Sequence, residues 1–246
     1  MKLIINGAGG RMGQTLLSII GSSDKYTLAA SCSMEFDTDA GNNIYKNIAE
    51  FDGEANCIID FSNHLATKDV TEYAVKRNIP LVVATTGQTA EELDMIREAS
   101  ESIPLFYSQN MSLGVAVLSC LAKITAKAFP DADIEIIEKH HNQKLDVPSG
   151  TAILLADSIK SVKDDCEYNI GRHEYGKRKK NEIGIHAIRM GGEVGTHEII
   201  FAMGSQVLTL KHEAENRSLF AEGALSAADF LTKQEAGFYN MDNILD

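Results

Sequence analysis

The sequence predicts an α/β protein in which an N-terminal doubly wound parallel sheet precedes a central α+β domain. Three observations lead to this prediction. Short apolar segments alternate with helical patterns over residues 1–112, a glycine-rich turn joins the first segment to the first helix, and strand patterns dominate after residue 128.

The N-terminal part opens with a strand, a turn and a helix. Residues 3–5 are predicted to form a short buried strand and residues 11–20 a helix, because Met12, Leu16 and Ile20 recur at helical spacing. The next predicted elements are helices at residues 66–77 and 89–100 and strands at residues 26–32, 57–61, 81–84 and 104–107. Strands that alternate with helices need crossover connections, which give a mostly parallel sheet with helices on both faces.

The pattern changes after the apolar helix that is predicted at residues 115–128. Few helices stand among the strands that follow, which are predicted at residues 134–137, 183–189, 196–202 and 207–212. The central part is therefore predicted to form a second domain of α+β type. A last apolar helix, residues 218–231, is expected to pack on one of the two domains.

The composition is that of an ordinary globular protein. The chain has 246 residues, of which 44% are hydrophobic and 24% are charged. Its net charge of -12 argues against a general affinity for nucleic acid, since phosphate backbones favour a basic surface. The one basic cluster, residues 172–180, is interpreted as a solvated loop.

The cysteines and the apolar runs bear on the cellular compartment. Four scattered cysteines without metal-ligand spacing predict neither a disulfide framework nor a metal site, and they fit a reducing compartment. The apolar start at residues 1–5 is too short for a signal-peptide core, and no run approaches the ~20 residues of a membrane span. We therefore expect a cytoplasmic protein without a membrane partner.

The glycine turn predicts a nucleotide cofactor. Gly7, Gly10 and Gly13 lie between the first strand and the first helix, where glycines allow a tight turn and the close approach of a pyrophosphate. The phosphates then bind the free N–H groups and the positive end of the helix dipole. With a second strand about 20 residues later, this arrangement predicts a Rossmann-like dinucleotide-binding domain.

The end of the second predicted strand bears on the choice between NADPH and NADH. An acidic residue usually binds the ribose hydroxyls there, whereas this chain has Ser33 and Met34, with Glu35 slightly beyond. NADH selectivity is therefore not indicated. Arg11 is placed to face a 2'-phosphate without a second basic residue beside it, so we expect NADPH to be modestly favoured and both cofactors to work.

A cluster of polar residues at positions 138–152 predicts an acid/base site for an acidic substrate. Residues 148–151 form a good helix N-terminus, which would bind a carboxylate, and Lys144 adds a positive charge. A histidine, either His140 or His141, can transfer a proton near neutral pH. Such a proton is needed when hydride adds to one carbon of a conjugated system.

His140, His141 and Lys144, followed by the run at residues 148–152, closely resemble the signature of the 4-hydroxy-tetrahydrodipicolinate reductase family. The resemblance extends over nearly the whole chain. Matching runs stand in family order at residues 7–13, 60–62, 85–87, 110–114, 195–198 and 211–212, with Arg217. The chain departs from the family pattern at three places. Ser33 and Met34 stand where some members have an acidic residue followed by a basic one, and Asn63 stands where some members have an arginine. Met111 occupies a position that is aromatic in many members.

The resemblance implies two domains with different tasks. Residues 1–112 with 217–246 would bind the dinucleotide, and residues 113–216 would bind the substrate and build a homotetramer through an open sheet. In the family the first histidine is the acid/base and the lysine is the second catalytic group, which map to His140 and Lys144. Substrate contacts map to His141, Gly150 and Thr151. Cofactor contacts map to Gly7, Ala8, Gly9, Gly10, Arg11, Met12, Ser33, Ala84, Thr85, Thr86, Ser108, Gln109, Asn110 and Met111.

The resemblance also implies a reaction of lysine and diaminopimelate biosynthesis. 4-Hydroxy-tetrahydrodipicolinate, a small dicarboxylate, would lose water and receive hydride from NADPH or NADH at ring C4, while His140 delivers a proton to C3. Without the resemblance, the residues alone also allow two other hypotheses about the function. One is a different NAD(P)-dependent dehydrogenase of a small acidic metabolite, because fold does not fix function. The other is a non-catalytic nucleotide-sensing protein, which would need the glycine turn but not the His-His-Lys segment.

Overall fold

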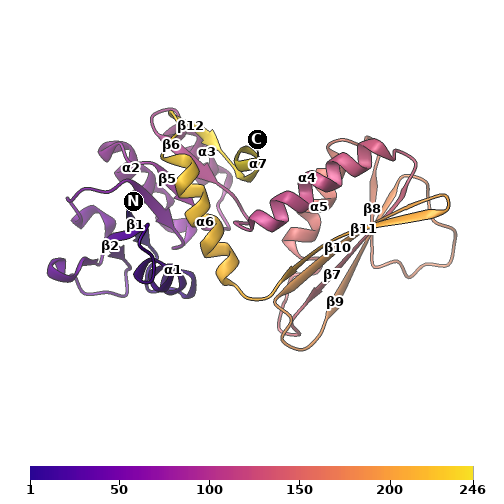
Figure 1. Cartoon of the computed structure of the whole chain (residues 1–246), viewed down its shortest axis with the longest axis horizontal. Helices are drawn as coiled ribbons and strands as arrows, with labels where there is room; N and C mark the ends of the chain where they lie inside the picture. Colours follow the sequence, from indigo (N-terminus) through magenta and orange to yellow (C-terminus); the bar gives the residue numbers. More distant parts are fainter. Residues whose placement is uncertain (246) are drawn as a thin grey trace. The chain divides into compact units, whose positions relative to one another are not determined.

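The computed structural model, which describes residues 1–245, divides after Ser112 and again after Arg217 into two units (Figure 1). The first unit comprises Met1–Ser112 together with the C-terminal part of the chain from Ser218, and the second comprises Leu113–Arg217. No helix of the described residues is both long and apolar enough to cross a membrane.

The first unit contains a parallel sheet, as predicted, and this sheet has seven strands. Its strand order is β12-β6-β5-β4-β1-β2-β3, and every neighbouring pair is parallel. The direction of winding reverses between β1 and β4, and ligands of such sheets bind outside the carboxyl ends of the strands at this point. The strands are β1 (Lys2–Asn6), β2 (Thr27–Cys32), β3 (Ile44–Tyr45), β4 (Cys57–Asp60), β5 (Leu81–Val83), β6 (Pro104–Tyr107) and β12 (Gly237–Tyr239).

Helices cover both faces of this sheet. On one face α2 (Thr67–Arg77) and α3 (Ala90–Ser100) pack their apolar residues on side chains such as Ile58 and Leu81. The C-terminal helix α6 (Ser218–Leu231) contacts α1 (Arg11–Gly21) and the strands β4, β5 and β6. The smaller elements are α7 (Met241–Leu245) and the 3-10 helices η1 (Ala40–Asn42), η2 (Ile48–Glu50) and η3 (His64–Ala66).

The second unit contains a separate mixed sheet of five strands, in the order β11-β10-β7-β9-β8. The outer strands β10 and β11 run antiparallel to their neighbours, whereas β7, β8 and β9 are parallel to one another. The elements are α4 (Leu113–Ala128), β7 (Asp133–His140), α5 (Gly150–Lys160), β8 (Glu167–Ile170), β9 (Glu182–Arg189), β10 (Gly195–Met203) and β11 (Gln206–Ala214). Together the two sheets confirm the predicted fold class.

Both helices of the second unit lie on the same side of its sheet (Figure 1). There Leu118, Leu155 and Ile159 from the helices are buried with Ile136 and Phe201 from the strands. Because side chains alternate along a strand, one set of residues on β7, β9 and β10 faces α5 and the other set faces away from it. This alternation decides which polar side chains meet at the N-terminus of α5.

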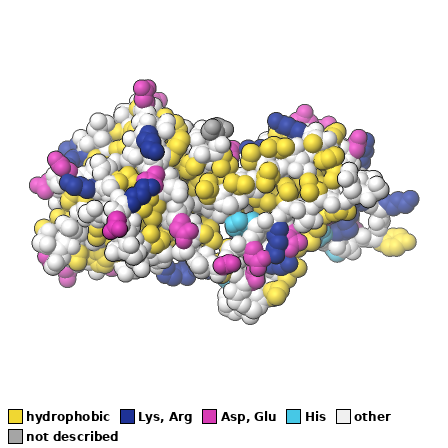
Figure 2. Space-filling model, viewed as in Figure 1, with side chains coloured by type: hydrophobic (Ala, Val, Ile, Leu, Met, Phe, Trp, Pro, Cys, Tyr) yellow, Lys and Arg dark blue, Asp and Glu magenta, His cyan; other side chains and the backbone are white. Residues whose placement is uncertain are grey.

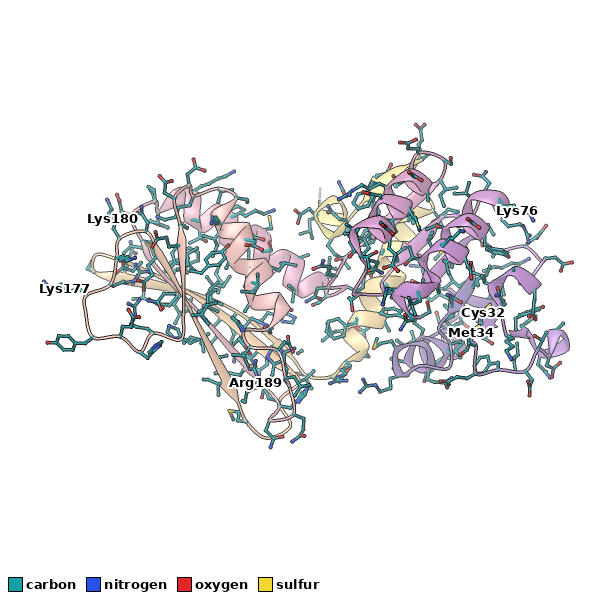
Figure 3. The ribbon with its side chains drawn as sticks, turned by 180° about the vertical axis from the view of Figure 1, so that it is seen from behind. Cys32, Met34, Lys76, Lys177, Lys180 and Arg189 are labelled. Carbon is teal, nitrogen blue, oxygen red and sulfur yellow. The ribbon has the colours of Figure 1, made fainter. Side chains whose placement is uncertain are left out.

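The structure departs from the sequence predictions in two respects. The short strands β3, β8 and β12 and the helix α7 were not predicted, because each is short and, unlike residues 3–5 and 81–84, contains no run of three aliphatic residues. The interpretation of residues 172–180 as a solvated loop is wrong for Arg172 and Arg178. Both guanidinium groups form ion pairs with Glu135, and Arg172 also pairs with the buried Glu182. Lys177 and Lys180, labelled in Figure 3, lie on the same loop.

Candidate functional site

The glycine turn after β1 has the geometry of a phosphate-binding turn. Gly7 has a positive φ of 83°, and a Cβ atom there would lie 2.5 Å from the main-chain carbon of Phe61. The N–H groups of Gly7 and Ala8 both donate to the Cys32 carbonyl at 2.9 Å, which fixes the turn against β2. Helix α1 then begins after Gly10 without a side-chain cap, so its N-terminus is available to an anion.

A cavity of about 290 Å³ opens beside this turn. Its walls come from the turn itself, from the segment after β2, from the segment after β3 and from the segment after β4. Representative lining residues are Gly10, Met34, Lys46 and Ser62. A turn with room for phosphates and a cavity at the carboxyl ends of the strands fit the adenosine half of a dinucleotide.

Two charged residues of this cavity bear on the choice between NADH and NADPH. The Glu35 carboxylate lies 3.0 Å from the position that a Cβ of Gly9 would take, next to the Ser33 hydroxyl. An acid therefore stands at the glycine turn although it is displaced along the chain from the usual position. Lys46 follows β3, whose Tyr45 carbonyl accepts from the Ser33 N–H at 3.1 Å. Nothing in the sequence pattern indicated this base, because Lys46 follows a two-residue strand that was not predicted.

A buried carboxylate joins the carboxyl ends of β1, β4 and β5. Asp60 accepts hydrogen bonds from Asn6 Nδ2 at 2.7 Å, from the Ser62 hydroxyl at 2.6 Å and from the Thr85 hydroxyl at 2.8 Å. Burial raises the pKa of Asp60, and these hydrogen bonds oppose the rise. Asp60 therefore fixes the edge of the sheet on which the predicted cofactor residues lie.

The remaining predicted cofactor residues differ in exposure. Ala84, Thr85 and the Met111 side chain are buried, whereas Arg11, Thr86 and Gln109 are exposed and Met12 is partly exposed. The Ser108 hydroxyl donates to the Asn110 carbonyl at 2.7 Å and so shapes the loop after β6.

In the second unit, His140 ends strand β7 and is 8% exposed. Its Nδ1 lies 2.6 Å from Oε2 of the fully buried Glu138. Arg189, at the end of β9 and labelled in Figure 3, donates to both oxygens of the same carboxylate at 2.8 Å. Burial by itself raises the pKa of Glu138, but hydrogen bonds from His140, Arg189 and the Ser149 N–H outweigh it and hold the pKa at about 2.

Helix α5 begins beside this group. The Ser149 side chain caps the helix by accepting from the Ala152 N–H at 3.2 Å, and its hydroxyl also lies 3.1 Å from His197 Nε2. The His197 ring stands edge-on to the His140 ring at a centroid distance of 5.2 Å. Burial first, and then the nearby His140, lower the pKa of His197 to about 3, so His197 is neutral at physiological pH.

Lys144 and Gly150 share one partner, which is Asp146. The Lys144 Nζ forms an ion pair with Asp146 Oδ1 at 2.8 Å. Hydrogen bonds from Lys144 and from the Gly150 N–H lower the pKa of this carboxylate. An internal carboxylate therefore occupies the position that the sequence assigns to a carboxylate of the substrate. His141 stands apart from this pair, with its Nε2 3.5 Å from Arg217 Nη2.

The structure therefore brings His140, Lys144, Gly150 and Thr151 together around the start of α5, whereas His141 contacts Arg217 instead. Hydrogen bonds connect His140 through Glu138 to Ser149, and the first turn of α5, which includes Gly150 and Thr151, follows directly. Sequence reasoning gave no role to Glu138, Arg189 or His197. Glu138 begins the polar segment at residues 138–152 and His197 lies in a matching run, whereas nothing in the sequence indicated Arg189. Across the described residues no group of side chains has the composition of a metal site.

Comparisons with known proteins point in one direction. The family model described as dihydrodipicolinate reductase, N-terminus, matches residues 1–111, and the model for the C-terminus of the same reductase matches residues 114–245. The 4-hydroxy-tetrahydrodipicolinate reductase of Clostridium novyi (strain NT) is 42% identical over 99% of this chain and 98% of its own length. That of Caldanaerobacter subterraneus subsp. tengcongensis is 44% identical over 100% and 98%.

A solved structure gives the same result. Dipicolinate-bound dihydrodipicolinate reductase from Paenisporosarcina sp. TG-14 superposes with a TM-score of 0.85 at 25% identity, over 99% of both chains. A probable dehydrogenase from Thermotoga maritima superposes with a TM-score of 0.68 at 11% identity and shares the fold alone.

Proposed function

The chain belongs to the dihydrodipicolinate reductase family, and we propose that His140 is its proton donor in the reduction of 4-hydroxy-tetrahydrodipicolinate to tetrahydrodipicolinate. It is an NAD(P)H-dependent oxidoreductase of lysine and diaminopimelate biosynthesis. The observation that carries the assignment of the site is the His140 ring held by the Glu138 carboxylate at the N-terminus of α5.

The first unit is the proposed site of the nicotinamide cofactor, which supplies the hydride. The main chain of residues 7–12 would hold the pyrophosphate, because its turn and the uncapped start of α1 offer N–H groups to an anion. Ser33 and Glu35 would face the adenosine ribose from the cavity beside the turn. Residues 84–86 and 108–111 would line the path toward the nicotinamide.

The second unit is the proposed site of the small dicarboxylate substrate. Lys144, His141 and the N–H groups of Gly150 and Thr151 would bind a substrate carboxylate, since they combine positive charge with the N-terminus of a helix. Asp146 already holds two of these donors, so the substrate carboxylate would exchange with the Asp146 side chain. The solved relative described as dipicolinate-bound supports a ligand of this class.

Proton transfer is proposed to use His140 Nε2. Hydride addition at ring C4 leaves electron density at C3, which must be protonated before the product can leave. The Nδ1 atom of His140 is engaged by Glu138, so Nε2 is the nitrogen that can carry the proton to C3. Lys144 would act as the second catalytic group by stabilising negative charge on the bound substrate.

Assembly and location also remain proposals. A homotetramer built through the second unit is supported by exposed apolar side chains on its surface, among them Val117, Leu121, Ile124 and Val207. A cytoplasmic location is supported by the four cysteines, which all lie in the described part of the chain and are free thiols.

A substrate panel with both cofactors tests the proposed function. 4-Hydroxy-tetrahydrodipicolinate, made in the cuvette from pyruvate and aspartate semialdehyde by a separate synthase, should be reduced with NADH and with NADPH at 340 nm. Other small acids, such as 2-oxo acids and amino acids, should give no turnover. Efficient turnover of one of those acids, without turnover of the ring substrate, would assign the chain to another dehydrogenase.

A further inference from the structure

Both oxygens of the Glu138 carboxylate are saturated by donors. Oε2 lies 2.6 Å from His140 Nδ1 and 2.8 Å from Arg189 Nη1. Oε1 accepts from the Ser149 N–H at 3.0 Å and from Arg189 Nη2 at 2.8 Å. A bidentate guanidinium together with a main-chain N–H leaves this buried carboxylate a single orientation.

The register of the sheet places these side chains together. Glu138 and His140 are two residues apart on β7 and therefore point to the same face, the one that carries α5. On β9 the partner of His140 is Arg189, and that of Glu138 is Ala187, whose small side chain leaves room for the guanidinium. Arg189 Nη2 also donates to the Asp146 carbonyl at 2.8 Å. The group is thus fixed by two strands and the start of a helix.

This arrangement determines which nitrogen of His140 carries a hydrogen in the neutral ring. With its pKa lowered to about 2, Glu138 is ionised at neutral pH and can only accept hydrogen bonds. Nδ1 must therefore be the N–H donor, and Nε2 is left to bind and release a proton. A Cβ atom at Gly195 would lie 3.0 Å from Nε2, so a glycine at this position keeps the space beside that nitrogen clear.

The other charged and titratable groups near the ring do not replace this partner. His197 on β10 is held neutral by burial, and burial also lowers the pKa of His212, its neighbour in register on β11. Lys144 and Asp146 form an ion pair with each other. Glu138 is therefore the carboxylate that contacts the ring, and Arg189 is the cation that fixes Glu138.

We propose that Glu138 and Arg189 are positioning residues for the reaction: they hold the His140 ring in the Nδ1–H form and present Nε2 to the substrate. This inference rests on the proposed role of His140 as the proton donor. Neither residue needs to touch the substrate for this role. A carboxylate that orients a histidine in this manner also stabilises the positive charge of the protonated ring.

The tautomer of the neutral His140 ring can be measured in the wild-type protein. In ¹⁵N-histidine NMR spectra, the His140 signals are identified by their loss in His140→Gln. We expect the neutral ring to carry its hydrogen on Nδ1. A neutral ring with the hydrogen on Nε2 would overturn the proposal, whatever the variants show.

Kinetics of Glu138→Gln test the consequence for catalysis. We expect kcat to fall at least about 10- to 100-fold, the range for losing the hydrogen-bond partner of a metal-bound histidine, with the KM for the substrate and the Kd for NADH near the wild-type values. The alkaline limb of the pH–rate profile should move to lower pH, because no carboxylate then stabilises the protonated ring. Glu138→Asp should restore part of kcat, and Arg189→Lys should lower kcat because it loses the bidentate contact.

The matched control is Glu198→Gln. Glu198 pairs with Lys139 at 3.2 Å across β7 and β10, on the face of the same sheet that points away from α5. This variant should keep the wild-type kcat and pH profile. If Glu138→Gln changed kcat and the pH profile no more than Glu198→Gln does, Glu138 would only stabilise the fold and the proposal would be wrong.

The outcomes separate this proposal from the proposed function. Wild-type turnover in His140→Gln would show that His140 is not the proton donor, so both proposals would be wrong. Slow turnover in His140→Gln with normal turnover in Glu138→Gln would remove only the positioning role. If Glu138→Gln does not fold, the NMR measurement on the wild type and the kinetics of Arg189→Lys decide the question.

Discussion

Lys144 is the side chain whose truncation should affect both substrate binding and turnover. Its Nζ lies at the start of α5, paired with Asp146, and it is 22% exposed as a side chain. In Lys144→Ala a dianionic ligand would lose a charge-assisted partner, so we expect the KM to rise and kcat to fall, each by tenfold or more, or about 1.4 kcal/mol. Steady-state kinetics measure both. The control is Lys139→Ala, which removes a lysine from the face of the sheet that points away from α5. If Lys144→Ala kept the wild-type KM and kcat, Lys144 would have no role in binding or catalysis.

Glu35 and Lys46 should set the cofactor preference in opposite directions. The Glu35 carboxylate at the turn favours the ribose hydroxyls of NADH, whereas Lys46 in the same cavity favours the 2'-phosphate of NADPH. We expect both cofactors to work, with kcat/KM values within ~10- to 100-fold of each other and NADPH modestly favoured.

Substitutions then report on each side chain separately. Glu35→Gln should raise the ratio of kcat/KM for NADPH over NADH, and Lys46→Ala and Arg11→Ala should lower it. Ser33→Asp should shift the preference toward NADH, because it adds ribose contact and phosphate repulsion together. If none of these substitutions changed the ratio of the kcat/KM values for NADPH and NADH, other residues would determine the cofactor preference.

Residues of the site differ in how far the sequence revealed them. His140, Lys144 and Gly150 stand within one short segment, so their spacing alone predicted a common site. Arg189 meets Glu138 across 51 residues of sequence, and the contact exists only because β7 and β9 pair in a specific register. Lys46 likewise depends on the pairing of β2 with β3. Such contacts follow from strand pairing, which hydrophobic patterns in single segments do not encode.

Long periodic segments were predicted well from the sequence, whereas short edge strands were not. Helices such as α2 and α3 show their apolar face over 11 residues each. By contrast β3, β8 and β12 comprise two to four residues and exist because a neighbouring strand supplies hydrogen bonds. The structure also resolved where the last long helix packs, since α6 contacts β4, β5 and β6 of the first unit.

The N-terminus of α5 should bind a dicarboxylate without cofactor chemistry. Pyridine-2,6-dicarboxylate, a planar dianion that resembles the product ring, should compete with the substrate. In this structure Asp146 accepts the hydrogen bonds that the ligand would take, so Asp146→Asn should lower the inhibition constant by removing a competing carboxylate. Inhibition kinetics and calorimetry measure this effect. A lack of competition at millimolar ligand would contradict the position assigned to the substrate.

The apolar surface of the second unit predicts that the protein self-associates. Leu113, Val117, Leu121 and Ile124 form an exposed stripe along α4, where hydrophobic side chains gather in Figure 2. Ile188 and Val207, which are 40% and 63% exposed, lie on the face of the sheet that points away from the helices. Exposed apolar areas of this kind are typical of subunit interfaces.

Light scattering tests this expectation. We expect a mass near four times the 26.8 kDa of one chain. Val207→Lys combined with Ile188→Lys should reduce the mass, because buried interfaces exclude unpaired charges. A wild-type protein with the mass of a single chain would contradict the tetramer.

The proposed reaction depends on protonation of the substrate by His140. The most direct measurement compares His140→Gln with the wild type in the coupled assay and determines the Kd of NADPH for both proteins. We predict that kcat falls about 10²- to 10⁴-fold, as expected for the loss of a general acid, while the Kd stays near the wild-type value. Turnover at the wild-type rate in a folded His140→Gln protein would contradict this role of His140.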